Sequence, residues 1–202
     1  MAEAVNEGLL DKLKTAIRTS TAPAKARAAG DWFKEKVRQA SASARMRAVT
    51  PNQLLRRQPE DDIMLGKMFF YKYDPKFAKK LPYWDMYPLV FPFERAKGGF
   101  YGINLHYLPP NARTDLLLRL IKAQGGSGNL DADFKLGRLT FNVISRFKPA
   151  IPCIKRYLYG QVRSKGFYGI SGEDWAYAAA LPIQQFEKAD ASTVWKWSKS
   201  QY

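Results

Sequence analysis

The sequence predicts an α+β fold: a small antiparallel sheet or partly closed, SH3-like barrel with flanking helices, preceded by a basic helical arm. Two observations predict this class. Residues 66–110 hold short bursts of aromatic and aliphatic residues separated by Pro, Gly and Asp, a pattern typical of short strands joined by turns. Residues 1–50 are instead rich in Ala, Ser, Thr, Lys and Arg, and their only aromatic residues are Trp32 and Phe33.

The predicted sheet lies in residues 66–110. We expect strands within 68–73, 87–93 and 100–108, because each stretch is short and apolar and is bounded by turn-forming residues. Asp74-Pro75 follows the first stretch and Gly98-Gly99 precedes the third. Three short strands at this spacing favour a small antiparallel sheet or a partly closed barrel.

Helices are expected on both sides of a central loop. The Pro-Pro pair at 109–110 ends the sheet, and Asn111 is placed to cap a helix over 112–124. The Gly-rich segment 125–133 reads as a loop. Apolar residues then recur at helical spacing from 134 to 147, which predicts an amphipathic helix ending before Pro149.

The pentapeptide GFYGI occurs twice, at 99–103 and at 166–170. Two short copies do not establish a repeat architecture, but they predict that the second copy is another strand entered through a glycine turn. Ser171 is placed to cap a short helix that ends before Pro182. The segment with Val194, Trp195 and Trp197 is expected to pack back onto the domain.

Two regions follow from the composition: a basic, Ala/Ser-rich helical arm and connector at 1–58, and the α+β domain at 59–202. Up to Arg57 the chain has twelve Lys or Arg residues and five Asp or Glu residues. The arm has few large apolar residues, so it either becomes ordered on a partner or remains a solvated tail. Both alternatives stay open at the level of sequence.

The net charge of the 202-residue chain is +15, whereas small domains commonly need a magnitude of only about 2–8 for solubility. Such an excess favours a polyanionic partner. No apolar run approaches the roughly 20 residues that span a bilayer, and the N-terminal residues lack the apolar core of a signal peptide. We therefore expect nucleic acid as the partner, no membrane, and a protein that stays in the cytoplasm where it is made.

Residues 134–172 combine cations with aromatic rings and contain no Asp or Glu. Cations attract phosphates regardless of sequence, and aromatic faces stack on exposed bases. The candidate phosphate contacts are Lys135, Arg138, Arg146, Lys148, Lys155, Arg156, Arg163 and Lys165. The candidate stacking rings are those of the two GFYGI copies, above all Tyr101 and Tyr168, together with Phe100 and Phe167. The alternative is that these four rings belong to the core.

The sequence holds no pattern typical of catalysis or of a cofactor. His106 is the only histidine and Cys153 the only cysteine, which excludes a disulfide framework and a zinc site within the chain. We expect Cys153 to be a small buried residue and His106 to be structural or to contact phosphate. There is no nucleophile motif and no phosphate-binding glycine loop. The prediction is a non-enzyme without metal or cofactor.

Three stretches carry a resemblance: YDPKFAKKLPYWDMYPLVFPFERAKGGFYGINLHYLPPNAR, RFKPAIPCIKRYL and EDWAYAAALPIQQFEKA. The region from Gly66 onward resembles the DNA end protector proteins of T-even-like contractile-tailed phages, most specifically at 73–76, 81–83 and 104–109.

This resemblance implies a virion protein at the ends of packaged linear double-stranded DNA, which shields them from host exonuclease and helps to complete the head. It implies other proteins of the head–tail region as partners, and a location in the virion and, during assembly and after DNA ejection, in the host cytoplasm. The alternative is a neck or baseplate connector that makes protein–protein contacts without binding DNA.

Overall fold

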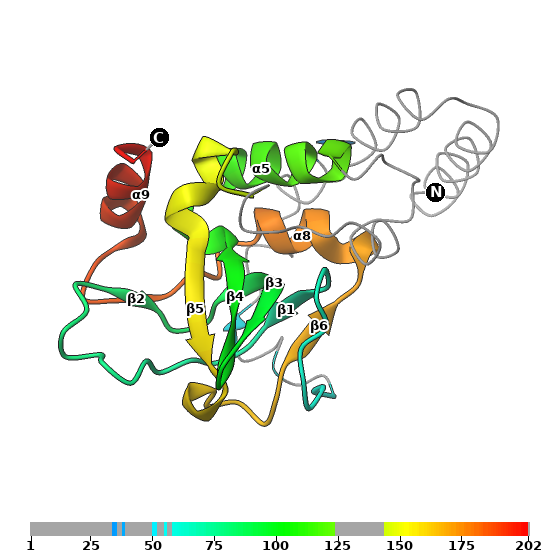
Figure 1. The fold of residues 1–202 in the computed structure, drawn as a ribbon. Coiled ribbons are helices and arrows are strands. Elements are labelled where there is room, and N and C mark those ends of the chain that lie inside the picture. Colours follow the sequence, from blue (N-terminus) through cyan, green and yellow to red (C-terminus); the bar gives the residue numbers. More distant parts are fainter. Residues whose placement is uncertain are drawn as a thin grey trace.

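The computed structural model describes residues 58–123 and 144–201, together with positions 34, 35, 38, 50, 51 and 55 (Figure 1). The expected arm helices, the 125–133 loop and most of the 134–147 helix lie outside the described residues. So do two of the candidate cations, Lys135 and Arg138.

A five-stranded antiparallel sheet forms the centre of the described domain, in the order β5-β4-β3-β1-β6. Its strands are β1 (Met68–Phe70), β3 (Leu89–Ala96), β4 (Gly99–Asn104), β5 (Ile154–Leu158) and β6 (Tyr168–Ile170). A separate two-stranded sheet joins β2 (Trp84–Asp85) to β7 (Phe186–Glu187). In the described residues β5 and β6 are the two edges of the larger sheet, which therefore does not close. The α+β class is confirmed, and the expected SH3-like barrel is not.

Both GFYGI copies contribute to the sheet: the first lies entirely within β4, and the last three residues of the second form β6. Their glycines allow close approach of neighbouring chains. A Cβ atom on Gly99 would lie 1.8 Å from the carbonyl oxygen of Tyr157, and one on Gly166 would lie 2.6 Å from that of Glu60. Both distances are shorter than real contacts, so these positions require glycine because of packing.

The sheet separates two hydrophobic clusters, because successive side chains in a strand point to opposite faces. On one face, Phe70 and Phe91 pack with helices α5 (Pro110–Ala123) and α8 (Trp175–Ala180); the rings of Phe91 and Trp175 are 4.6 Å apart. Figure 1 shows these helices together at one end of the sheet. The other face carries a mainly aromatic cluster. Its members are Ile63, Phe69, Tyr71, Tyr73, Val90, Phe100, Tyr157 and Phe167.

Helix α5 begins at Pro110, before the expected position, so Asn111 lies inside the helix and is not its cap. Proline is well suited to the first helical position because the missing N–H has no partner there. The third strand also ends earlier than expected. Residues Leu105–Tyr107 form a 3-10 helix, η1, in which the backbone N–H of His106 donates to the side-chain oxygen of the cap residue Asn104 (3.0 Å).

Arg113 in α5 is fully buried and is the main polar contact between this helix and the segment after α8. Its guanidinium donates to the carbonyl oxygens of Leu108 (2.7 Å), Ala179 (3.3 Å) and Leu181 (3.2 Å), and to Oε1 of Gln184 (2.7 Å). Burial lowers the pKa of Arg113 to about 10.

Short 3-10 helices connect the remaining elements: η2 (Lys148–Cys153), η3 (Tyr159–Gln161) and η4 (Gly172–Asp174). Ser171 is the cap residue of η4, but its hydroxyl donates to the Asp174 carboxylate and makes no hydrogen bond to a helix N–H. Helix α9 (Ala191–Lys199) packs back onto the domain as expected. Val194 is buried, and the indole N–H of Trp195 donates to the carbonyl oxygen of His106 (3.0 Å).

Candidate nucleic-acid interface

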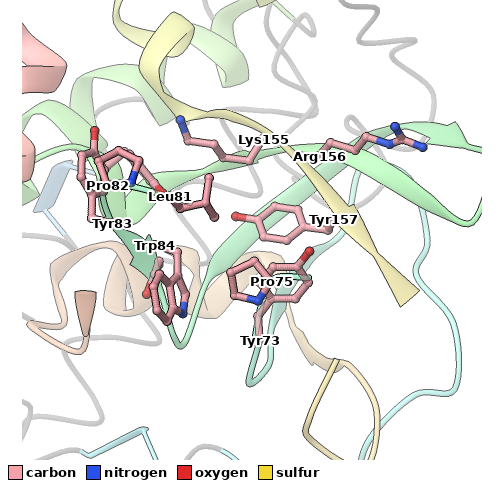
Figure 2. A pocket seen from close by; sticks show the side chains of 11 residues that line it. Tyr73, Pro75, Leu81, Pro82, Tyr83, Trp84, Lys155, Arg156 and Tyr157 are labelled. Atoms are coloured by element: carbon pink, nitrogen blue, oxygen red, sulfur yellow. The ribbon is translucent and has the colours of Figure 1, made fainter. Parts of the chain in front are cut away.

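A cavity of about 260 Å³ opens between β5 and the loop formed by residues 74–83. Aromatic and apolar side chains make up most of its wall, including those of Leu81, Tyr83, Trp84 and Tyr157. Figure 2 shows Leu81 and Tyr157 approaching from the loop and from β5, with Lys155 beside them. The cavity thus combines ring surfaces with a cation.

The inner end of the cavity is a buried polar network centred on Asp85. One carboxylate oxygen accepts from the backbone N–H of Tyr87 (3.1 Å). The other accepts from Nδ2 of Asn104 (3.0 Å) and from Nδ1 of His106 (2.9 Å). Asn104 also donates to the Tyr157 hydroxyl (2.9 Å). These bonds satisfy a carboxylate that is only 3% exposed and fix the wall of the cavity.

His106 is a structural residue. Its side chain is completely buried, and burial lowers its pKa although Asp85 acts in the opposite direction. The ring is therefore neutral, with the proton on the Nδ1 atom that faces Asp85. No phosphate reaches a fully buried ring, so of the two roles expected from sequence only the structural one fits.

Lys155 lines the cavity as a cation without an anionic partner. Its Nζ lies 4.2 Å from the centre of the Tyr107 ring. Within the described part of the chain, no carboxylate makes an ion pair with it. Burial lowers its pKa, because the charged form loses hydration that no partner replaces. An anionic ligand in the cavity would supply that missing partner.

A row of three aromatic rings, of which the outer two are stacked, leads from the surface to this lysine. Trp197, which is 45% exposed, stacks on Tyr83 with ring centres 5.1 Å apart and an angle of 26° between the planes. Tyr83 is in turn 5.9 Å from Tyr107, over which Lys155 lies. The row offers successive ring faces beside one cation.

The 74–83 loop adds exposed charge at the mouth of the cavity. Lys76, Lys79 and Lys80 are all exposed, and Phe77 beside them is 59% exposed. The ammonium of Lys188 fixes the loop, since it donates to the carbonyl oxygens of Ala78 (2.6 Å), Lys79 (3.3 Å) and Leu81 (3.0 Å). Sequence reasoning treated this segment only as a turn. The three lysines around Phe77 are the feature of the sequence from which a surface site could have been predicted.

The predicted cations follow the edge strand and do not converge on one point. Arg146 and Lys148 are exposed before β5, and Arg163 and Lys165 are exposed after it. Arg163 lies 3.7 Å from the Asp74 carboxylate. Lys165 borders a second, more open cavity of about 450 Å³ that also contains Asp61, Asp62 and Arg95.

The neighbours Lys155 and Arg156 point in opposite directions. Because alternate residues of a strand share a face, Lys155 lies on the same face as Tyr157 while Arg156 lies on the other. Arg156 also borders the cavity, but Figure 2 shows its guanidinium directed away from the other lining side chains, and it donates to the carbonyl oxygen of Lys97 (3.0 Å). Among the candidate cations in the described residues, Lys155 is the one whose charged group faces the cavity.

The aromatic candidates of the GFYGI copies lie mostly in the core. Phe100, Phe167 and Tyr168 are 0%, 3% and 5% exposed, and Tyr101 is partly buried. The ring of Phe167 packs edge-on against Tyr71 at 5.1 Å. For Phe100, Phe167 and Tyr168 the structure therefore agrees with the alternative that these rings belong to the core, and the neighbouring glycines serve close packing of the chains.

The sequence matches the family described as phage T4 terminal DNA protecting protein over residues 3–199. The chain belongs to this family. The match to the terminal DNA protecting family includes residues 3–58 of the arm, which the resemblance seen in the sequence did not reach. No curated protein matches the chain, and neither does any solved structure.

Two further findings concern the described residues alone. None of their helices is long and apolar enough to cross a membrane. In the same part of the chain, no group of three or more His, Cys, Asp or Glu side chains is arranged to hold a metal ion.

Proposed function

We propose that this protein binds the ends of packaged linear double-stranded DNA as a virion component, shields them from host exonuclease and assists head completion. The observation that carries the proposal is the family match over residues 3–199, since the family is described by protection of terminal DNA. That description names a protective role and no reaction, in agreement with a non-enzymatic function.

The charge of the chain supports DNA as the ligand. A net charge of +15 favours a polyanion, and exposed cations lie on both the 74–83 loop and the β5 edge. The exposed members of the predicted set, Arg146, Lys148, Arg156, Arg163 and Lys165, remain our proposed phosphate contacts. Lys135 and Arg138 remain predictions from sequence. Tyr168 is not retained because its ring is buried.

Phosphate contacts alone do not distinguish an end from the middle of a duplex, because both carry the same backbone charge. An end-protecting protein needs a site for a group that only the terminus exposes, such as an unstacked base or a terminal phosphate. The cavity lined by Lys155 and by Tyr83, on which Trp197 stacks, has the required chemistry.

The test is exonuclease protection of linear duplex by the purified full-length chain, with competitor DNA of two kinds. Short linear fragments, which are rich in ends, should abolish protection at a mass at which closed circular DNA has little effect. Equal competition by the circles would mean that charge alone drives binding. In that case the connector alternative, in which the basic surface contacts acidic virion proteins of the neck or baseplate, would replace the proposal.

A further inference from the structure

We infer that the cavity between β5 and the 74–83 loop holds one unpaired nucleotide of the DNA terminus, with its phosphate at Lys155 and its base against the Tyr83 and Trp84 side of the wall. This inference rests on the proposed function and adds the chemical group through which an end is recognised.

The size of the cavity fits a single nucleotide unit. Its volume of about 260 Å³ lies just below the range of about 300–1,000 Å³ typical of small-molecule sites. A base pair, which is twice the width of a single base, does not enter such a space. The terminal nucleotide must therefore be unpaired, either as an overhang or after the last base pair has opened.

The charge of the cavity fits a phosphate. Lys155 has lost part of its hydration and has no carboxylate partner among the described residues, so a phosphate oxygen would provide the missing counter-charge. Asp85 also borders the cavity, but its oxygens already accept hydrogen bonds from Tyr87, Asn104 and His106. The carboxylate therefore belongs to the wall, and Lys155 remains the group available to an anion.

The rings at the mouth favour nucleic acid over a peptide. The Trp197–Tyr83 stack continues inward to Tyr107, and a series of ring faces beside cations is the usual arrangement for binding single-stranded bases without sequence preference. The 74–83 loop, which lines the cavity with Pro75 and Leu81, also carries exposed lysines, and these would contact the phosphates that follow the bound nucleotide.

The inference predicts that an unpaired terminus binds more tightly than a blunt one, because a blunt end must first lose a base pair. The experiment measures fluorescence anisotropy of the full-length protein at one fixed salt concentration with DNA hairpins that have a single end. The ends are blunt, or carry a three-nucleotide 3′ or 5′ overhang. A closed dumbbell of the same length serves as the DNA without ends. We expect one overhang polarity to bind about five-fold or more tightly than the blunt hairpin.

Two neighbouring variants provide the matched comparison. Lys155→Met removes the cation that faces the cavity, and Arg156→Met removes an equal charge from the opposite face of the same strand. Arg156→Met should weaken binding to every DNA by the same factor and keep the overhang preference. Lys155→Met should abolish the preference, and Lys155→Arg should restore part of it.

A third variant, Leu81→Trp, fills the cavity without changing charge, so it tests the site if Lys155→Met does not fold. It should lose the overhang preference while its binding to the dumbbell stays within about two-fold of the original protein. Retained preference in this folded variant would overturn the nucleotide site.

The outcomes separate the two proposals. If the original protein binds the dumbbell as tightly as every hairpin with an end, the proposed function fails. If it prefers ends but binds blunt and overhanging hairpins equally, or if Lys155→Met and Arg156→Met behave alike, the nucleotide site is overturned and end binding stands.

Discussion

Arg113 is a fully buried cation and Lys155 a partly buried one, and they differ in their partners. Arg113 donates to four acceptors within the fold, three of them backbone carbonyls. Lys155 contacts the face of Tyr107 and has no carboxylate partner in the described residues. A buried charge is costly unless it is paired and hydrogen-bonded. The comparison therefore assigns Arg113 to the fold and Lys155 to a ligand.

The largest effect on stability is expected from the replacement of Arg113. Arg113→Met should lower the free energy of unfolding by roughly 3–5 kcal/mol, because buried carbonyl oxygens lose a charged donor and stay without a partner. Urea denaturation measures this change. Arg119→Met, an exposed cation of the same helix, is the control and should change stability by less than about 0.5 kcal/mol. If Arg113→Met lowers the free energy of unfolding by less than about 1 kcal/mol, Arg113 does not have the stabilising role assigned to it.

Aromatic residues provide a second pair for the same comparison. Tyr168→Ala should cost about 3 kcal/mol of stability, since it removes a ring from the core. Trp197→Ala removes a ring that is 45% exposed, so it should cost about 1 kcal/mol or less and should instead weaken binding to DNA ends. Both quantities are measured on both variants. Tyr168→Ala should lose mainly stability, and Trp197→Ala should lose mainly affinity for DNA ends. If both variants lose mainly stability, the rings at the cavity mouth serve the fold.

Lys155→Met should leave the free energy of unfolding unchanged or raise it by up to about 1 kcal/mol. The reason is that the folded protein no longer carries a poorly hydrated charge without a partner. The same denaturation measurement checks this prediction. A clear loss of stability would show that Lys155, like Arg113, holds the fold together, and the contrast between the two cations would disappear.

The pH dependence of binding should report the environment of Lys155. Burial lowers its pKa below the ordinary value of 10.5, so the ammonium loses its proton, and the phosphate its partner, earlier than at an exposed lysine. The overhang preference should therefore fall as the pH rises toward that value, and Lys155→Arg should remove this dependence. Between the lowered and the ordinary pKa the unfolded chain binds more protons, so stability itself rises with pH in that window.

Other groups around Lys155 define the control for this titration. They are Tyr107 of η1, Tyr83 of the loop, Cys153 of η2, Asp85 of β2 and Tyr157 of β5. Burial raises the pKa values of both Tyr107 and Tyr83 while it lowers that of Lys155, so these shifts favour loss of the Lys155 proton before either ring ionises. An identical pH profile in Lys155→Arg would assign the titration to one of these neighbours.

The smallest effect concerns Cys153, whose expected burial is confirmed. Burial raises the pKa of its thiol to about 12, and only the thiolate is an effective nucleophile. A thiol-directed reagent at pH 8 should therefore react slowly with the folded protein and fast in denaturant. Rapid reaction without denaturant would show that the region between η2 and Lys155 opens readily.

The positions of the strands could be predicted from the sequence where several consecutive residues are buried. The apolar bursts at 68–73, 87–93 and 100–108 contain β1 and most of β3 and β4, because strand segments covered on both faces are apolar throughout. The same property concealed the orientation of the rings. With both faces apolar, no alternation distinguishes an inward ring such as Phe100 from an outward one.

The two cations were not predictable for a different reason: their environments come from distant parts of the chain. Three of the acceptors of Arg113 lie 66 to 71 residues further along. Lys155 meets Tyr107 only because η1 and β5 are brought together by the fold. Local periodicity carries no information about such pairs, so Arg113 was overlooked and Lys155 could not be separated from the other cations near it.

The hydrogen bonds from Lys188 to the 74–83 loop have a consequence for the order in which the parts of the protein can form during synthesis. All five strands of the main sheet are present in the chain once Ile170 has been made. The wall and mouth of the cavity still await Lys188, which holds the 74–83 loop, and Trp197, which stacks on Tyr83. A growing chain on the ribosome therefore contains all the strands of its main sheet before it contains every residue of the cavity, so the nucleotide site is completed after the sheet.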